Sequence, residues 1–398
     1  MTEQTDAARA IESTALGRFE PRTLTTAASA HLDLIRAIAA SAVMWGHVRA
    51  HFFVDYQHLR ERNAALSALY FFTGFGHQAV MVFFVLSGFL ISASILQARA
   101  SDRWSWREYG INRASRLYVV LVPGLLFGFL WDKLGSTLFA GTGLYWHALE
   151  DLGPAIAQNQ LTLKAFFGNL FFVQTILCTT FGSNGPLWSL ANEFWYYVLF
   201  PVLLFAGVAW AARSTRRAVP LTILAVGLGL FLGWDKLIGF LIWLAGCGLV
   251  LMYARFGRVS RRWLIPYLIV STLALAACLG AARLGRSAIL GSDLAVGFAF
   301  ALFLFGVLHI ELGAGSLLYH RVAHFVAGFS YSLYVLHFPF VLFLRAWIAS
   351  PERWQPQGRH LLFGVVIGVG ALTYAWLVST FTERKTSAVR HRLRRILQ

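Results

Sequence analysis

The sequence predicts an all-α protein, a polytopic bundle of about ten transmembrane helices. Its composition is the first reason: of 398 residues, 58% are hydrophobic and 13% are charged, which no soluble domain of this size tolerates on its surface. The second is that apolar segments of about 18 to 25 residues recur along the chain. We therefore expect one membrane domain over 29–383, between a polar tail (1–28) and a basic tail (384–398), both in the cytoplasm.

Apolar runs that could cross a bilayer follow one another along the chain. In order they cover roughly 31–53, 70–95, 115–134, 165–181, 187–211, 219–234, 237–254, 263–282, 294–312, 325–347 and 361–381. Basic clusters lie at helix ends, at 99–116, 213–217, 255–262 and 384–395. The positive-inside rule predicts that these clusters share the cytoplasmic side. If every run crossed, they would face opposite sides, so one run does not cross.

The run 165–181 is the weakest candidate, because it is short and is interrupted by Gly168, Asn169 and Gln174. We predict that it is a re-entrant or interfacial segment. The remaining ten spans then leave 135–186 as an external region over the bundle and both termini in the cytoplasm. The predicted location is the plasma (inner) membrane, as a multi-pass protein.

The formal net charge of +16 does not indicate a nucleic-acid binder, because the basic residues gather at the membrane-proximal helix ends. Such clusters attract anionic lipids and anionic cytosolic ligands. The first 28 residues are polar and lack the pattern of a signal peptide. The three cysteines lie in apolar segments without metal-ligand spacing, so we predict neither a structural disulfide nor a metal centre.

Arg36 and His47 place two ionisable side chains inside the first apolar run. Their spacing returns to nearly the same helix face and separates them by roughly 16 Å along the axis. Charge inside a membrane is costly unless it lines a cavity or finds partners, so the default interpretation is a functional site. Arg36 alone, near the inner end, can instead snorkel to the headgroups.

Asn192 and Glu193 lie about two turns below the outer end of the helix that begins near Leu187. His47 lies at the same depth in the ten-span topology, roughly 9 Å below the surface. We therefore predict that Glu193 pairs with His47, fixes its tautomer and lets it work as a general base.

Other candidate residues have structural alternatives. Acceptor binding is assigned to Asn192, Trp188, Tyr334 and His337. Trp188 also fits an interfacial aromatic belt, and Tyr334 with His337 fits a buried hydrogen-bonded pair. His47, His51 and Asp55 have a spacing that suggests metal ligands, but their outer members fall at a loop boundary, so no metal is expected.

Five segments carry a family resemblance. They are Arg36 with His47, Gly76–Ile91, Arg113–Arg116, Leu187–Tyr197 and Ser330–His337. In this order, over most of residues 31–385, they resemble acyltransferase family 3, a family of integral membrane O-acyltransferases. Two positions depart from the family pattern: Met81 stands where many members have an acid, and Lys385 where a Pro is common. The first weakens any role for a carboxylate in the second helix.

The resemblance implies transfer of an acyl group, most often acetyl, from cytosolic acyl-CoA to a hydroxyl of a carbohydrate. Arg113 and Arg116, at i,i+3 on one helix face, would bind the phosphate-rich donor. Arg36 would polarise the thioester carbonyl or hold the pyrophosphate, and His47 would take the hydroxyl proton or accept the acyl group. The expected partners are membrane lipids, the carbohydrate acceptor and polysaccharide biosynthesis machinery, with no nucleic acid.

A proton-coupled carrier or flippase for a glycan or an organic acid is the alternative function. It would use Arg36, His47 and Glu193 as a proton relay. The halves of the chain show no convincing internal repeat, which disfavours it. A membrane scaffold for polysaccharide assembly is a third alternative, but it explains neither Arg36 nor Glu193.

Overall fold

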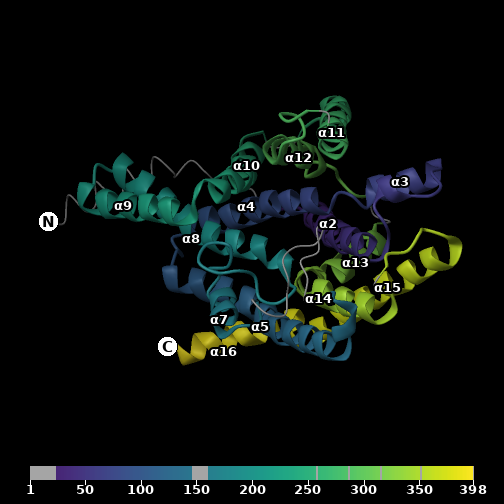
Figure 1. The fold of residues 1–398 in the computed structure, drawn as a ribbon. Coiled ribbons are helices and arrows are strands. Elements are labelled where there is room, and N and C mark those ends of the chain that lie inside the picture. Colours follow the sequence, from purple (N-terminus) through teal and green to yellow (C-terminus); the bar gives the residue numbers. More distant parts are fainter. Residues whose placement is uncertain are drawn as a thin grey trace. The chain divides into compact units, whose positions relative to one another are not determined.

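The computed structural model describes residues 24–145, 160–256, 259–285, 287–313, 316–349 and 352–397, and in them the chain is helical, without strands (Figure 1). The α-helices are α2 (Thr26–Phe52), α3 (Ala64–Phe72), α4 (Gly76–Ala100), α5 (Trp106–Leu138), α7 (Leu163–Leu170), α8 (Trp188–Ala211), α9 (Thr215–Leu232), α10 (Trp234–Phe256), α11 (Arg261–Leu284), α12 (Asp293–Val307), α13 (Leu317–Ala327), α14 (Ser330–Ile348), α15 (Gly358–Phe381) and α16 (Thr386–Ile396). Short 3-10 turns are η1 (Tyr56–His58), η2 (Ala140–Thr142), η3 (Gly185–Leu187) and η4 (Glu383–Lys385). The all-α prediction is confirmed.

Nine helical segments of the described residues are long and apolar enough to cross a membrane. The remaining predicted span, 294–312, is helical only over α12, which has 15 residues. Its C-terminal end is a turn, in which the ring of His309 bonds the Phe305 carbonyl at 2.7 Å. The described residues therefore contain nine candidate spans and one short apolar helix, which supports a multi-pass membrane protein.

The run 165–181 forms no spanning helix, as predicted. Helix α7 begins after the N-cap Thr162 and ends at Leu170, after eight residues. The Asn169 side chain donates to the carbonyls of Ala165 (2.8 Å) and Thr179 (3.0 Å) and accepts from the Phe181 amide (3.1 Å). These bonds fold the chain back on itself after α7, and Phe172 and Thr175 take positive φ in the turn.

The chain divides into two compact units, which we describe separately. Unit 1 contains Met1–Ser29, Met81–Tyr109 and Asn192–Leu312, and unit 2 contains Ala30–Val80, Gly110–Ala191 and Gly313–Gln398. The predicted tail 1–28 lies outside the described residues as far as residue 23, and α2 begins at Thr26. The predicted basic tail contains helix α16, which ends with Arg394, Arg395 and Ile396.

Glycines bring α4 and α10 together in unit 1. A Cβ on Gly88 would overlap the carbonyl oxygen of Trp243, and one on Gly246 would overlap that of Val85. The Trp243 indole donates to the Ser87 hydroxyl at 3.1 Å beside this crossing. Backbone contact of this kind is possible only at glycine, so Gly88 and Gly246 permit close helix packing.

Replacement of Gly88 by alanine is expected to lower the free energy of unfolding by about 1–3 kcal/mol, because the added methyl group meets backbone and not a flexible side chain. Thermal unfolding in one detergent checks this. The matched control is Gly229→Ala on α9, where an added Cβ meets open space. Equal melting temperatures of the two variants would contradict the proposed packing.

Helices α2, α5 and α14 run parallel in unit 2, and α15 runs antiparallel to them. Along α5 and α14, the Tyr331 hydroxyl donates to the Leu117 carbonyl (3.3 Å), Gly124 faces Val335, and the rings of Trp131 and Phe343 lie 4.8 Å apart. Helix α15 runs in the opposite direction, and its Gly368 faces the Trp45 side chain of α2. Just beyond the C-terminal end of α15, the Glu383 carboxylate accepts a hydrogen bond from Ser332 at the start of α14.

Unit 2 therefore has two distinct ends. The Arg36 end holds the starts of α2, α5 and α14 and the end of α15, with Arg36, Arg116 and Glu383. The His51 end holds the other ends of these helices, with His51, Arg345 and Arg353.

Candidate active site

A pocket of about 380 Å³ opens within unit 2. Helix α2, the segment 73–80, the turn before α8 and helix α14 form its walls. Its lining includes Val43, Gly46, His47, Arg49, Ala50, Thr73, Gly74, Gly76, His77, Val80, Gly185, Pro186, Trp188, Tyr334 and Phe338. Three of the predicted site residues, His47, Trp188 and Tyr334, thus share one pocket.

His47 forms a hydrogen-bonded pair with His337. The Nδ1 atom of His47 lies 2.8 Å from Nε2 of His337, and the two rings stack at a centroid distance of 5.1 Å. His337 is completely buried. Its own Nδ1 lies 2.9 Å from the carbonyl oxygens of Leu333 and Tyr334, one turn back on α14.

This chain of bonds determines the tautomer of His47. Carbonyl oxygens only accept, so Nδ1 of His337 carries a proton and the Nε2 atom of its neutral ring accepts. The bond from His47 must then be donated by its Nδ1–H, which leaves the lone pair on Nε2 of His47. His47 therefore has the arrangement of a general base, with His337 as the residue that positions it.

Tyr334 and Trp188 are held against the same pocket. The Tyr334 hydroxyl lies 2.6 Å from the Ser189 hydroxyl and donates to the Pro186 carbonyl at 3.0 Å. The Trp188 indole stacks on His77 at 6.1 Å. The turn before α8 is thereby fixed to α14, which makes packing the first role of Tyr334.

A second group of charges surrounds Arg36. The guanidinium pairs with Asp33 at 2.7 Å, and Arg116 and Glu383 are close enough to act on it electrostatically. The Ser332 amide (3.0 Å) and hydroxyl (2.9 Å) both donate to the Glu383 carboxylate. Asp33 thus pairs with Arg36, and Glu383 lies close enough to act on it, at the end of unit 2 opposite His51 and on the helix that carries His47.

A family model described as an acyltransferase domain matches residues 29–380. This chain belongs to the acyltransferase 3 family. Residues 29–380 include the His47 pocket and the Arg36 cluster except Glu383.

Two curated relatives are similar to part of this acyltransferase chain. One is YrhL of Bacillus subtilis, provisionally named a peptidoglycan O-acetyltransferase, with 26% identity over 161 residues, 38% of this chain and 23% of that protein. The other is the acyltransferase MdmB of Streptomyces mycarofaciens, with 32% identity over 170 residues, 42% of this chain and 37% of that protein. The chain thus covers less than two fifths of either relative. No solved structure matches it.

Asn192 and Glu193 belong to unit 1, whereas His47 belongs to unit 2. Within unit 1 the Tyr197 hydroxyl, one turn along α8, donates to the Glu193 carboxylate. Asn192 is buried. The predicted pairing of Glu193 with His47 stays a prediction.

Arg113 and Arg116 lie in the first third of α5, as the motif predicts. Arg116 is exposed and interacts electrostatically with Arg36, whereas Arg113 is half-buried. The structure thus brings Arg116 and Arg36 together at one end of unit 2, and their role in donor binding stays a prediction.

Sequence reasoning missed two partners, Asp33 and Glu383. Asp33 stands three residues before Arg36, and this i,i+3 spacing was a usable signal. Glu383 lies far from Arg36 in the sequence and acts on it electrostatically, and no local sequence pattern predicts such a contact.

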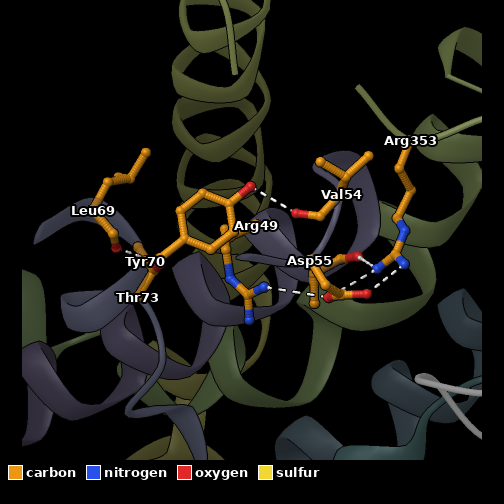
Figure 2. Close-up of polar contacts among 8 residues, drawn as sticks. Arg49, Val54, Asp55, Leu69, Tyr70, Thr73 and Arg353 are labelled. Carbon is orange, nitrogen blue, oxygen red and sulfur yellow. Dashed lines mark hydrogen bonds and ion pairs between the residues drawn. The ribbon is translucent and has the colours of Figure 1, made fainter. Parts of the chain in front are cut away.

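Asp55, the last residue of the metal alternative, has another partner. Its carboxylate accepts hydrogen bonds from Arg353 at 2.6 and 3.2 Å (Figure 2). Among the described residues, no group of three or more His, Cys, Asp or Glu side chains is arranged to hold a metal ion.

Proposed function

We propose that this protein is an O-acyltransferase that moves an acetyl group from cytosolic acyl-CoA to a hydroxyl of a carbohydrate. The observation that carries the proposal is the His47–His337 pair, which lines the pocket and leaves a lone pair on Nε2 of His47. Membership of the acyltransferase 3 family and the names of the two relatives agree with the chemistry.

In the proposed step, Nε2 of His47 takes the proton of the acceptor hydroxyl as its oxygen attacks the thioester carbonyl. A C–O bond forms and the C–S bond breaks. The leaving thiolate then takes the proton from His47. Throughout, Nδ1–H of His47 stays bonded to His337, which keeps the ring oriented as its charge changes.

The donor is proposed to enter at the Arg36 end. Arg113 and Arg116 suit the phosphate groups of coenzyme A, because guanidinium groups bind phosphate through paired hydrogen bonds. Arg36, which pairs with Asp33, would face the pyrophosphate or the thioester. Trp188, Asn192 and Tyr334 are proposed to contact the acceptor.

The topology of unit 2 supports entry of the donor from the cytoplasmic side. Helix α2 begins and α15 ends at the Arg36 end, so both termini leave the bundle on one side. The basic helix α16 follows α15, which favours the cytoplasm for the Arg36 end. We propose the inner membrane as the location.

Purified protein incubated with radiolabelled acetyl-CoA and a carbohydrate fraction tests the proposal. An acyltransferase consumes the donor and labels the carbohydrate. A carrier moves a glycan or an acid across proteoliposomes without consuming acetyl-CoA, and that outcome would overturn the proposal.

Arg116→Ala is expected to raise the KM for acetyl-CoA about tenfold, the effect of losing one charge-assisted hydrogen bond, with little change in kcat. Arg216→Ala is the matched control, since Arg216 is an exposed basic residue at the start of α9 in unit 1. Equal KM values for the two variants would exclude a role of Arg116 in donor binding.

A further inference from the structure

Arg49 lines the same pocket as His47. The two residues stand two positions apart on α2, so their side chains leave the helix on different sides. His47 lies against His337 of α14, whereas Arg49 lies against Tyr70 of α3. They are still close enough for the charge of Arg49 to act on the His47 ring. The base and the guanidinium group therefore border the pocket from different sides.

Contacts with residues outside the pocket lining orient the Arg49 side chain (Figure 2). Its guanidinium carbon lies 5.3 Å from the ring centre of Tyr70, whose hydroxyl donates to the Val54 carbonyl at 2.7 Å. Its Nη1 atom lies 3.8 Å from Oδ1 of Asp55. A guanidinium group has five N–H donors in one plane, so contacts of this kind are compatible with donation to a substrate.

Arg49 differs from the other polar side chains of the pocket in its charge. Among the described residues that line the pocket, it is the one Lys or Arg. Two hydroxyl groups of the lining donate to backbone carbonyls: Thr73 to Leu69 at 2.6 Å and Tyr334 to Pro186 at 3.0 Å. A guanidinium group keeps its positive charge at every physiological pH. Arg49 is therefore the group of this lining best suited to a negatively charged oxygen.

The proposed acyl transfer creates such an oxygen next to His47. When the acceptor oxygen attacks the thioester carbonyl, the π electron pair of that carbonyl moves to its oxygen, which needs a strong donor in direct contact. Arg36 stands roughly 16 Å from His47 along the axis of α2, which exceeds the length of an arginine side chain. Arg49, in the pocket itself, is the arginine within reach of the reacting carbonyl.

We propose that Arg49 binds the carbonyl oxygen of the thioester and stabilises the oxyanion of the tetrahedral intermediate. This inference rests on the proposed function, in which His47 is the base in the same pocket. A C–O bond forms as the carbonyl electron pair moves to the oxygen at Arg49. The pair then returns, the C–S bond breaks, and the leaving thiolate takes the proton from His47. Arg36 is thereby assigned to the phosphate groups of the donor.

Steady-state kinetics of purified full-length variants test the role of Arg49. Arg49→Gln is expected to lower kcat about tenfold, because a neutral amide replaces a charged donor at the oxyanion. Arg49→Lys is expected to lose less, since it keeps the charge. The KM values for acetyl-CoA and for the carbohydrate stay at the wild-type level, because the oxyanion forms only after both have bound. A wild-type kcat in Arg49→Gln, or a change in KM alone, overturns the inference.

Arg353→Gln is the matched control, because Arg353 shares the Asp55 carboxylate with Arg49 but is not part of the pocket lining. Arg353 bonds Asp55 at 2.6 and 3.2 Å, closer than Arg49 at 3.8 Å. If Arg49 only supported this network, Arg353→Gln would lower kcat at least as far as Arg49→Gln. We expect Arg353→Gln to keep the wild-type kcat, with thermal unfolding measured on the same samples. Equal losses in the two variants overturn the inference.

Chemical rescue separates the guanidinium group from an effect on folding. Methylguanidinium added to Arg49→Ala is expected to raise kcat several-fold with increasing concentration, because it supplies both the charge and the N–H donors. The matched additive is tetramethylammonium at equal concentration, which carries the charge without N–H donors. An equal response of Arg49→Ala to both additives overturns the inference.

The same measurements keep this inference apart from the proposed function. Acetyl transfer that His47→Ala abolishes and Arg49→Gln retains at the wild-type rate overturns this inference alone. Wild-type protein that consumes no acetyl-CoA with any carbohydrate fraction overturns the proposed function, and with it the inference that rests on it.

Discussion

Replacing His47 with alanine is expected to lower kcat for acetyl transfer by about 10²- to 10⁴-fold, the usual contribution of a general base. The reason is that Nε2 of His47 is the proton acceptor in the pocket, and the hydroxyl oxygen cannot attack the thioester without losing its proton. Acetyl-CoA binding is expected to persist, because the proposed donor site lies at the Arg36 end of unit 2.

The matched control is His58→Ala. His58 is exposed in η1, and in the described structure it is bonded through its backbone carbonyl, by the Gln355 amide at 3.0 Å. Full activity of His58→Ala with loss of activity in His47→Ala assigns the effect to the imidazole at 47. An active His47→Ala variant would remove His47 from the chemistry.

Substitution of His337 tests how the base is positioned, and it has the second largest expected effect. Leucine at 337 removes the acceptor for Nδ1–H of His47, so the ring loses its fixed tautomer. We expect kcat to fall about 10- to 100-fold, the kinetic equivalent of a lost buried hydrogen bond, with the KM for acetyl-CoA unchanged.

Glutamine at 337 separates positioning from packing. Its side-chain oxygen accepts a hydrogen bond, so His337→Gln is expected to recover much of the activity that His337→Leu loses. A merely structural role for His337 predicts equal losses in both variants, together with lower melting temperatures. Measurement of kcat, KM and thermal unfolding on the same preparations distinguishes the two.

Local patterns predicted much of the fold and part of the site. The apolar runs predicted the helical bundle, because a membrane helix is recognised from the composition of one segment. The requirement that the basic clusters share one side of the membrane predicted that 165–181 does not span. The i,i+11 relation of Arg36 and His47 was equally local. Both residues lie on α2, and each is the centre of a polar cluster.

Contacts between distant segments could not be predicted in the same way. His337 was expected to contact the acceptor or Tyr334, but it lies against His47, 290 positions away in the chain. Glu383 approaches Arg36 only because α15 runs antiparallel to α2. The sequence also does not show that α12 is only 15 residues long, since the apolar composition continues past the turn at its end.

The most direct test of the central claim is a single-turnover experiment with labelled acetyl-CoA prebound to purified wild type and to His47→Ala. The account predicts equal occupancy of the donor in both proteins, rapid label transfer to carbohydrate in the wild type and, in the variant, label that stays on coenzyme A. Transfer by His47→Ala at the wild-type rate, or a wild type that holds the donor and never transfers it, would contradict the account.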